Sequence, residues 1–353
     1  NPPMSFRPTS KGHWGISLYG FIASIFAISL FSWQIGLCIF ISQFIIFIAI
    51  LKFRSENRVE GVWWGVVFSF VKRGLNSLHK IVQGTKNWRP ILMSITFNGE
   101  KNYPDKIAYI SEKIALYQGL VNMNIINDRR GENEIKKYDF TIPASLVAVN
   151  DPTEAVLSLV QSSNPSGIDP NSILLEYSKK INTVEVMNKI LDLEKNIFLL
   201  KNAERFKKHE KIDIWWRGEK NGNLMVLLAY IMNSSVESSK RKNHSIRIIR
   251  KLNPGEKEEQ VKKDITQIIE KARLNGEIVV LSEDENNFTE TLEKVSKDSD
   301  LIILGLPGTI KNEGIKKLFK LNELFFIQEI EKYNNLPTIL FVKSSTLFNL
   351  IEE

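Results

Sequence analysis

The sequence has 353 residues, of which 43% are hydrophobic and 25% are charged, with 47 Lys and Arg against 40 Asp and Glu. A chain of this length and composition can bury a core in one to three domains, which excludes intrinsic disorder. The single cysteine, Cys38, excludes an internal disulfide and a cysteine-based zinc site. The four histidines are too dispersed to suggest a metal site, and we expect neither a metal nor a cofactor.

The N-terminal region, residues 1–55, is apolar, and residues 12–51 contain no Asp, Glu, Lys or Arg. As a helix this stretch would be roughly 60 Å long, about twice the thickness of a bilayer core. Gln34 and Gly36 interrupt the apolar runs Gly15–Phe31 and Leu37–Leu51. The pattern therefore predicts two transmembrane helices joined by a hinge at Trp33–Gly36.

The charges around this hairpin predict its orientation. Arg7 and Lys11 precede the first apolar run, Lys52 and Arg54 follow the second, and the hinge has no charge. The positive-inside rule then places both flanks in the cytoplasm, with residues 56–353 cytoplasmic in a multi-pass protein of the cell membrane. A signal peptide has one short apolar run and fits this segment less well. Because the chain begins with Asn1, we expect it to be part of a longer protein.

Residues 56–86 are predicted to form a connecting element built on an amphipathic helix over 59–82. Its apolar residues recur mostly at spacings of three and four, which is typical of a helix with one apolar side. They are Val59, Val62, Trp63, Val66, Val67, Phe70, Leu75, Leu78 and Val82. The apolar side needs cover from lipid, from membrane helices or from the following domain, and Val66 and Phe70 lie at its centre.

From residue 87 onward, strand-like apolar runs alternate with helical patterns, which predicts an α/β fold with parallel sheets. We expect two similar units, residues 87–206 and 207–353, with a linker at Lys207–Glu210. The strands predicted in the first unit are Ile91–Phe97, Leu120–Ile126, Leu146–Val149, Ile173–Tyr177 and Ile197–Leu200. Those predicted in the second unit are Ile212–Trp216, Ile246–Arg250, Ile278–Leu281, Leu301–Leu304 and Thr338–Val342.

Catalytic motifs are absent from the sequence. It has no P-loop, dinucleotide-binding, zinc-protease or nucleophile-elbow pattern, and Cys38 has no base partner in its apolar surroundings. We therefore expect no catalytic residues and no enzymatic activity. The densest basic cluster, Lys240-Arg241-Lys242, lies in a polar loop-like stretch, so we expect no nucleic-acid binding.

One glycine pattern suggests a ligand. Gly305 and Gly308 follow the fourth strand of the second unit, where backbone N–H groups of an open α/β sheet can bind a phosphate. Both are therefore candidate nucleotide-binding residues. Universal stress proteins extend this G-x-x-G pattern by nine residues to a glycine followed by Ser or Thr, but here that position is Leu318 and the next glycine is Gly314. A structural turn is the other interpretation.

Taken in order, several motifs resemble the C-terminal part of the cation-chloride cotransporter family. They are Arg7-Pro8 before the hairpin, Asn87-Trp88-Arg89-Pro90, Gly167–Ser172, Ile212–Trp216 with Gly222-Asn223-Leu224, Leu304–Pro307, Leu321–Leu324 and Leu336–Val342. The set spans nearly the whole chain. Asn223 and Lys320 depart from the family pattern, which has glycine and arginine there.

The resemblance implies electroneutral symport of chloride with potassium, sodium or both, through ion-binding helices located before residue 1. The present chain would then supply no ion ligand. It would hold the last two spans, which contact lipid, and a regulatory domain that forms homodimers and resembles paired universal stress folds. The helix over 59–82 would couple this domain to the membrane part. Two alternatives remain, an amino acid permease-like transporter and a membrane-tethered nucleotide sensor of the universal stress type.

Overall fold

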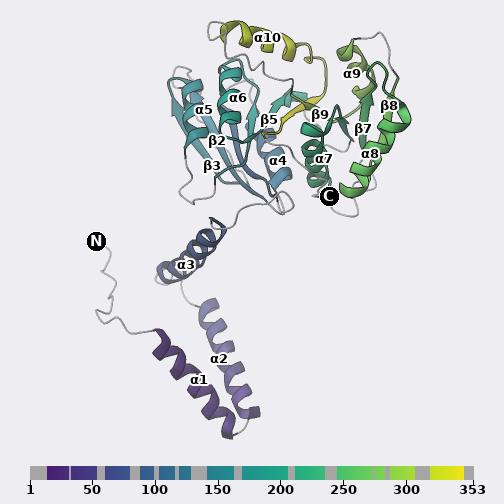
Figure 1. Cartoon of the computed structure of the whole chain (residues 1–353). Coiled ribbons are helices and arrows are strands. Elements are labelled where there is room, and N and C mark those ends of the chain that lie inside the picture. Colours follow the sequence, from purple (N-terminus) through teal and green to yellow (C-terminus); the bar gives the residue numbers. More distant parts are fainter. Residues whose placement is uncertain are drawn as a thin grey trace. The chain divides into compact units, whose positions relative to one another are not determined.

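The structure of the chain is a computed structural model (Figure 1). It describes residues 14–31, 33–53, 60–79, 88–98, 103–115, 119–128, 141–162, 169–205, 211–234, 245–272, 275–282, 287–306 and 319–345. The chain divides into two compact units, Asn1–Gly74 and Leu75–Glu353. Each unit is described by itself below.

The N-terminal unit consists of helices in its described residues. Helices α1 (Trp14–Phe31) and α2 (Trp33–Phe53) lie where the sequence predicted a transmembrane hairpin, and α3 (Glu60–His79) lies within the range of the predicted connecting helix and continues across the unit boundary. The hinge prediction was wrong, because Gln34 and Gly36 lie inside α2, which begins at Trp33.

The predicted membrane crossings have no support in the structure. Within the described residues, no helix combines the length and the apolarity that crossing a bilayer requires. The apolar stretch is divided into helices of 18 and 21 residues, about 27 and 32 Å long at 1.5 Å per residue, and α2 includes the polar Gln34 and the charged Lys52 near its ends.

The described part of the second unit contains one ten-stranded sheet with the order β3-β2-β1-β4-β5-β10-β9-β6-β7-β8. The first five strands are β1 (Ile91–Phe97), β2 (Leu120–Asp128), β3 (Ala144–Val149), β4 (Ser172–Glu176) and β5 (Asn196–Lys201). The second five are β6 (Lys211–Trp215), β7 (Ser245–Lys251), β8 (Glu277–Leu281), β9 (Leu301–Gly305) and β10 (Thr338–Lys343).

Each set of five strands is parallel, and the two sets have the same internal order, which confirms the predicted parallel α/β fold. We call these sets the first and second half-sheets. They join through one antiparallel pair, β5 with β10, in which Leu199 faces Phe341. The sequence did not predict this join.

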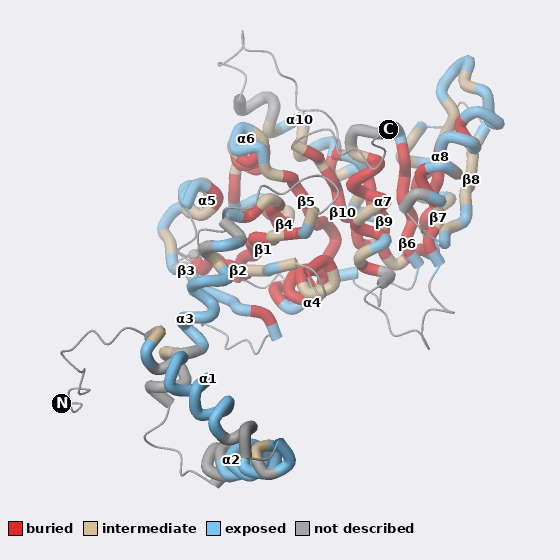
Figure 2. Tube along the Cα trace, turned by 60° about the horizontal axis from the view of Figure 1, so that its bottom comes forward, coloured by how far each residue is buried: buried red, intermediate tan, exposed pale blue. Residues whose placement is uncertain are grey.

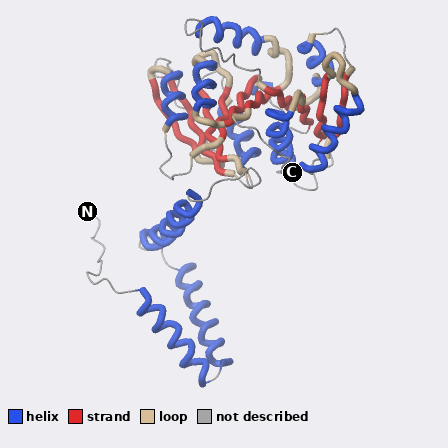
Figure 3. The backbone as a smooth tube through the Cα atoms, in the orientation of Figure 1, coloured by secondary structure: helices blue, strands red, loops and turns tan. Residues whose placement is uncertain are grey.

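Helices cover both faces of the sheet and give three layers (Figures 1 and 3). On one face pack α4 (Pro104–Ala115), α7 (Glu219–Ser234) and α8 (Glu258–Ala272). On the other face pack α5 (Pro152–Gln161), α6 (Thr183–Asp192), α9 (Phe288–Ser296) and α10 (Phe319–Glu331). Figure 2 shows the central strands buried between these layers. Burial of strand side chains on both faces explains why the strands read as continuous apolar runs.

Polar side chains hold the start of several helices and the join between the half-sheets. Asp151 Oδ1 accepts hydrogen bonds from the N–H groups of Thr153 and Glu154 and so caps α5. At the join, the Asn202 side chain donates to three carbonyl oxygens in residues 333–337, and its own carbonyl accepts from the Thr338 hydroxyl. These bonds tie the end of β5 to the segment that leads into β10.

Candidate functional site

Ligands of open α/β sheets usually bind beyond the carboxyl ends of the strands, where the strand order reverses. The first half-sheet has this switch point between β1 and β4, and the second has it between β6 and β9. The side chains at the ends of these four strands therefore define the two candidate sites.

Glu176 fills the first switch point. It is the last residue of β4 and only 3% exposed. Its carboxylate accepts hydrogen bonds from the Thr96 hydroxyl, the Tyr103 N–H (3.2 Å) and, at 3.5 Å, the Phe97 N–H. Burial raises the pKa of the Glu176 carboxyl above its ordinary value, and these hydrogen bonds oppose that rise.

The position of Glu176 excludes a ligand phosphate from this place. Tyr103 immediately precedes α4, and its N–H is one of the backbone donors that a helix N-terminus offers to an anion. Because Glu176 already binds that donor, a phosphate here would meet a buried carboxylate. Beside it, Asn98 donates to Asn127 (3.0 Å) and its carbonyl accepts from Lys180 Nζ (3.1 Å), which completes a polar cluster.

The second switch point lacks this carboxylate because Gly305 stands in its place. Leu175 pairs with Ile95 across β4 and β1, and Leu304 pairs with Trp215 across β9 and β6. The next residue along is Glu176 in β4 and Gly305 in β9. The second half-sheet therefore has no side chain where the first has a buried acid.

Asn221, near the start of α7, covers Gly305. A Cβ built on Gly305 would lie 3.4 Å from Asn221 Nδ2, and Asn221 Oδ1 accepts from the N–H of Ser344 after β10 (3.0 Å). Close to it, Gly222 is confined by Trp216, since a Cβ there would lie 2.1 Å from the indole Nε1. The guanidinium of Arg250 lies 5.7 Å from the centre of the Trp216 ring and binds Glu256 through both carboxylate oxygens. Side chains thus pack the second switch point as well.

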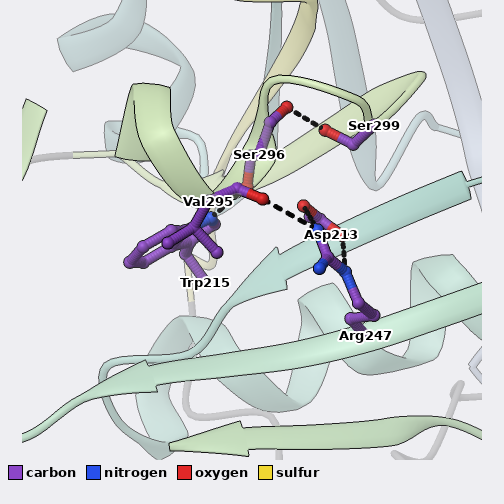
Figure 4. A network of polar contacts seen from close by, with 6 residues as sticks. All are labelled: Asp213, Trp215, Arg247, Val295, Ser296 and Ser299. Carbon is purple, nitrogen blue, oxygen red and sulfur yellow. Dashed lines mark hydrogen bonds and ion pairs between the residues drawn. The ribbon is translucent and has the colours of Figure 1, made fainter. Parts of the chain in front are cut away.

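A separate ion pair lies inside the second half-sheet (Figure 4). Arg247 Nε and Nη2 donate to the two oxygens of Asp213 at 2.9 and 2.7 Å, and Nη2 also donates to the Val295 carbonyl at 3.0 Å. The Asp213 side chain is only 1% exposed, and its hydrogen bonds raise the pKa of the Arg247 guanidinium. The pair joins β6, β7 and the end of α9, so its role is structural.

The predicted site residues lie in different parts of the structure. Gly305 ends β9 as the sequence indicated, while Gly308 lies outside the described residues. Nucleotide binding by these residues stays a prediction. Val66 lies within α3 but its side chain is outside the description, and Phe70 on the same helix is 70% exposed. Among the described residues there is also no group of His, Cys, Asp or Glu side chains that could hold a metal ion.

Most described residues of helices α1, α2 and α3 are exposed (Figure 2), and many of them are large and apolar. Ile16 is 73% exposed, Tyr19 76% and Trp33 68%. Similar exposure extends along the helices at Phe26, Phe40, Phe44, Ile45, Val67 and Val71. Large exposed apolar surfaces of this kind are unusual on protein surfaces and mark places of contact with other apolar groups.

No protein-family model matches this sequence, and no curated protein sequence does. Among solved structures, a universal stress protein from Archaeoglobus fulgidus is similar, with a TM-score of 0.42 and 10% identity over 71% of this chain and 96% of that chain. A protein of unknown function from Pseudomonas aeruginosa PAO1 is similar with a TM-score of 0.39 and 11% identity, over 73% of this chain and 94% of that chain.

Proposed function

We propose that this chain is a membrane-attached regulatory part of a secondary transporter that moves chloride together with potassium, sodium or both. The observation that supports the attachment is the exposed apolar surface of α1 and α2. These helices have no charged residue before Lys52, and water does not solvate such a surface at low cost. Lipid, or the apolar helices of a membrane-embedded transporter, would cover it.

The basic residues at the ends of the hairpin support a cytoplasmic position for the α/β domain. Arg7, Lys11, Lys52 and Arg54 flank the apolar helices, and the turn between the helices carries no charge. Basic residues next to apolar membrane segments remain on the cytoplasmic side and contact anionic headgroups. The choice of chloride and an alkali cation as substrates rests on the ordered cotransporter-like motifs of the sequence.

The packed first switch point supports a regulatory role over a catalytic one. Glu176 fills that switch point with a buried carboxylate, and the side chains of Asn221 and Trp216 pack the second. An α/β domain closed in this way is suited to transmit a conformational change or to bind a protein. A second copy of the chain is the partner that the cotransporter resemblance implies.

Membrane flotation tests the attachment. We expect the full chain, expressed in cells without detergent, to float with membranes in a density gradient. The double variant F40D/F44D should move to the soluble fraction, because each substitution places a charge on the apolar surface of α2. L146D, a charge on an exposed apolar residue of β3, is the matched control and should still float. A wild-type chain that stays soluble would overturn the proposal.

Ion flux tests the transport function. In proteoliposomes containing the polypeptide that carries the ion-binding helices together with this chain, we expect rubidium uptake to require chloride. Uptake of a labelled amino acid without chloride-dependent rubidium flux would assign the protein to the permease alternative. If the proteoliposomes show neither chloride-dependent rubidium uptake nor amino acid uptake, the transporter proposal is contradicted.

A membrane-tethered nucleotide sensor is a second candidate, and one observation favours it. Gly305 leaves the second switch point without the carboxylate that closes the first. Calorimetry on the detergent-solubilised chain tests this function with ATP as the probe. Binding by the wild type that weakens at least about tenfold in G305E would support it, because the introduced acid would repel the phosphates. No heat of binding in the wild type would remove this candidate.

A further inference from the structure

Helix α10 lies between two strands of the second half-sheet in the sequence, but it contacts a helix of the first half. It connects β9 to β10, yet the Glu323 carboxylate binds the start of α6, which belongs to the first half. Glu323 Oε1 accepts from the Thr183 N–H at 3.1 Å, and Oε2 accepts from the Val184 N–H at 2.8 Å. In Figure 1, α10 lies beside α6.

The start of α6 is a place where an α/β fold can bind an anion. It follows β4, on the side of the sheet edge where the strand order reverses. The first N–H groups of a helix have no partner within it, and the helix dipole adds a partial positive charge there. Asn182 Oδ1 satisfies the Glu185 N–H, and Glu323 takes the two N–H groups before it. The resident anion is therefore a carboxylate of the chain itself.

One donor at this helix start is not used by the carboxylate. Thr183 is only 1% exposed, and its hydroxyl has no hydrogen-bond partner among the described residues. The two oxygens of Glu323 are already bound to two N–H groups. A tetrahedral oxyanion has more acceptor oxygens and could bind the two N–H groups and this hydroxyl together.

The other end of α10 is held by different contacts. Glu331, its last residue, forms an ion pair with Lys179, and Asn202 binds the Tyr333 carbonyl that follows. Among the side chains that the structure describes, the hydrogen bonds at the beginning of α10 are the two that the Glu323 carboxylate accepts from Thr183 and Val184. Losing them would loosen one end of α10 and leave the sheet intact.

We propose that the N-terminus of α6 is a binding site for a tetrahedral oxyanion such as a phosphate group, which Glu323 occupies as a tethered competitor. A phosphate-bearing ligand binds by displacing Glu323, and displacement frees the first turns of α10 from the first half-sheet. The site is thereby coupled to the contact between the two half-sheets. This inference does not depend on membrane attachment or on transport.

Hydrogen exchange on the full chain in detergent tests the proposal, with inorganic phosphate as the probe and chloride at equal ionic strength as the reference. We expect phosphate, and not chloride, to speed exchange of the α10 amides in the wild type. In E323Q those amides should exchange fast without phosphate. E329Q, which alters an exposed acid on the same helix, is the matched control and should behave as the wild type.

Phosphate affinity gives a second readout. If Glu323 occupies the site about 90% of the time, the wild type binds phosphate about tenfold more weakly than E323Q. T183V should weaken phosphate binding in E323Q without altering the exchange of α10 in the wild-type background, because it removes only the hydroxyl. The proposal is overturned if E323Q and the wild type bind phosphate equally, if neither binds it, or if phosphate leaves the exchange of α10 unchanged. Should E323Q fail to fold, phosphate binding by the wild type and by the single variant T183V decides: the proposal then requires that the wild type binds phosphate, that T183V binds it more weakly, and that phosphate speeds exchange of the α10 amides in the wild type.

Discussion

Lys201 Nζ donates a hydrogen bond of 2.6 Å to Asn334 Oδ1 and so joins the end of β5 to the segment before β10. Lys201 is only 3% exposed. Burial lowers the pKa of its ammonium group to about 8, and the carboxylates of Glu204 and Glu331 oppose this shift while Arg205 and Lys179 add to it. A lysine that titrates near pH 8 therefore lies where the two half-sheets meet.

This lysine predicts a pH-dependent stability. Its folded pKa of about 8 lies below its unfolded value of 10.5, so between these pH values the unfolded chain binds a proton that the folded chain does not. The contribution of Lys201 to the free energy of unfolding therefore rises with pH in that window, by at most about 1.4 kcal/mol per pH unit. Below pH 8 both states are protonated and the contribution is constant.

Urea unfolding of the wild type and K201M between pH 7 and 10.5 checks this expectation. The difference in unfolding free energy between the two proteins should grow in favour of the wild type as the pH rises above 8. K201R, which keeps its charge throughout, should lack the rise. Parallel curves for the wild type and K201M would contradict the assigned titration.

The ion pair of Asp213 and Arg247 predicts that single and double variants differ strongly in the free energy of unfolding. R247A leaves the Asp213 carboxylate, 1% exposed, without its partner, and should lower the free energy of unfolding by about 3–5 kcal/mol. The double variant D213V/R247M removes both charges and should lose much less, because apolar side chains of similar size can replace a buried pair at little cost. A urea-unfolding cycle of the four proteins measures the coupling.

The exposed pair of Glu258 and Lys262 on α8 provides the control for this cycle. K262A should change the unfolding free energy by less than about 1 kcal/mol, since surface ion pairs contribute little. A loss in R247A no larger than that in K262A would show that the pair in Figure 4 does not stabilise the fold.

The buried carboxyl of Glu176 predicts that the stability of the fold depends on pH in the acidic range. Its folded pKa is raised above 4.5, so between 4.5 and the folded value the folded chain binds a proton that the unfolded chain does not. The contribution of Glu176 to stability is therefore present below pH 4.5 and declines as the pH rises through the folded pKa. E176Q keeps an acceptor for Thr96 and Tyr103 but cannot ionise, so it should lack this decline.

Unfolding free energies of the wild type and E176Q from pH 4 to pH 8 isolate the effect. E176Q should gain stability relative to the wild type as the pH rises. T96V should lower the free energy of unfolding at neutral pH by about 1–3 kcal/mol. This variant removes the hydroxyl that donates to the Glu176 carboxylate and so leaves the carboxylate with fewer hydrogen bonds. A wild type that gains stability over E176Q with rising pH would mean that hydrogen bonding outweighs desolvation at this carboxyl.

The strands and most helices were predictable from the sequence because their local patterns are strong. The runs at Ile91–Phe97 and Thr338–Val342 became β1 and β10 almost to the residue. The antiparallel pairing of β5 with β10 was not predictable, since the interior residues of both strands are apolar and buried and no pattern specifies which neighbour each strand will pair with. The membrane crossings were predicted from the apolar runs Gly15–Phe31 and Leu37–Leu51, and α1 and α2 cover these runs without giving support to a crossing.

The polar sites were only partly visible in the sequence. Asp213 and Arg247 each interrupt an apolar strand, and that pattern could have indicated a buried pair on neighbouring strands. Glu176 likewise ends an apolar run beside β1, in which Thr96 is the next-to-last residue. The contact of Glu323 with α6 had no sequence signal, because it joins residues about 140 positions apart through the packing of α10. Only the three-dimensional structure brings these groups together.

Phe70 on α3 carries the last prediction, which concerns the coupling of the domain to the membrane part. The side chain is 70% exposed although it is large and apolar, so it should contact lipid or transporter helices in the intact protein. F70D would bury a charge in that contact, and V66D, one turn earlier on the same helix, should act in the same direction. We expect each variant to lower chloride-dependent rubidium flux at least about tenfold, which corresponds to about 1.4 kcal/mol.

K72D is the control, because its exposed side chain lies on the opposite side of α3, two residues and about 200° away. Flux and oligomeric state are measured in the same proteoliposomes. Unchanged flux with an unchanged oligomeric state in F70D and V66D would show that α3 does not couple the domain to transport.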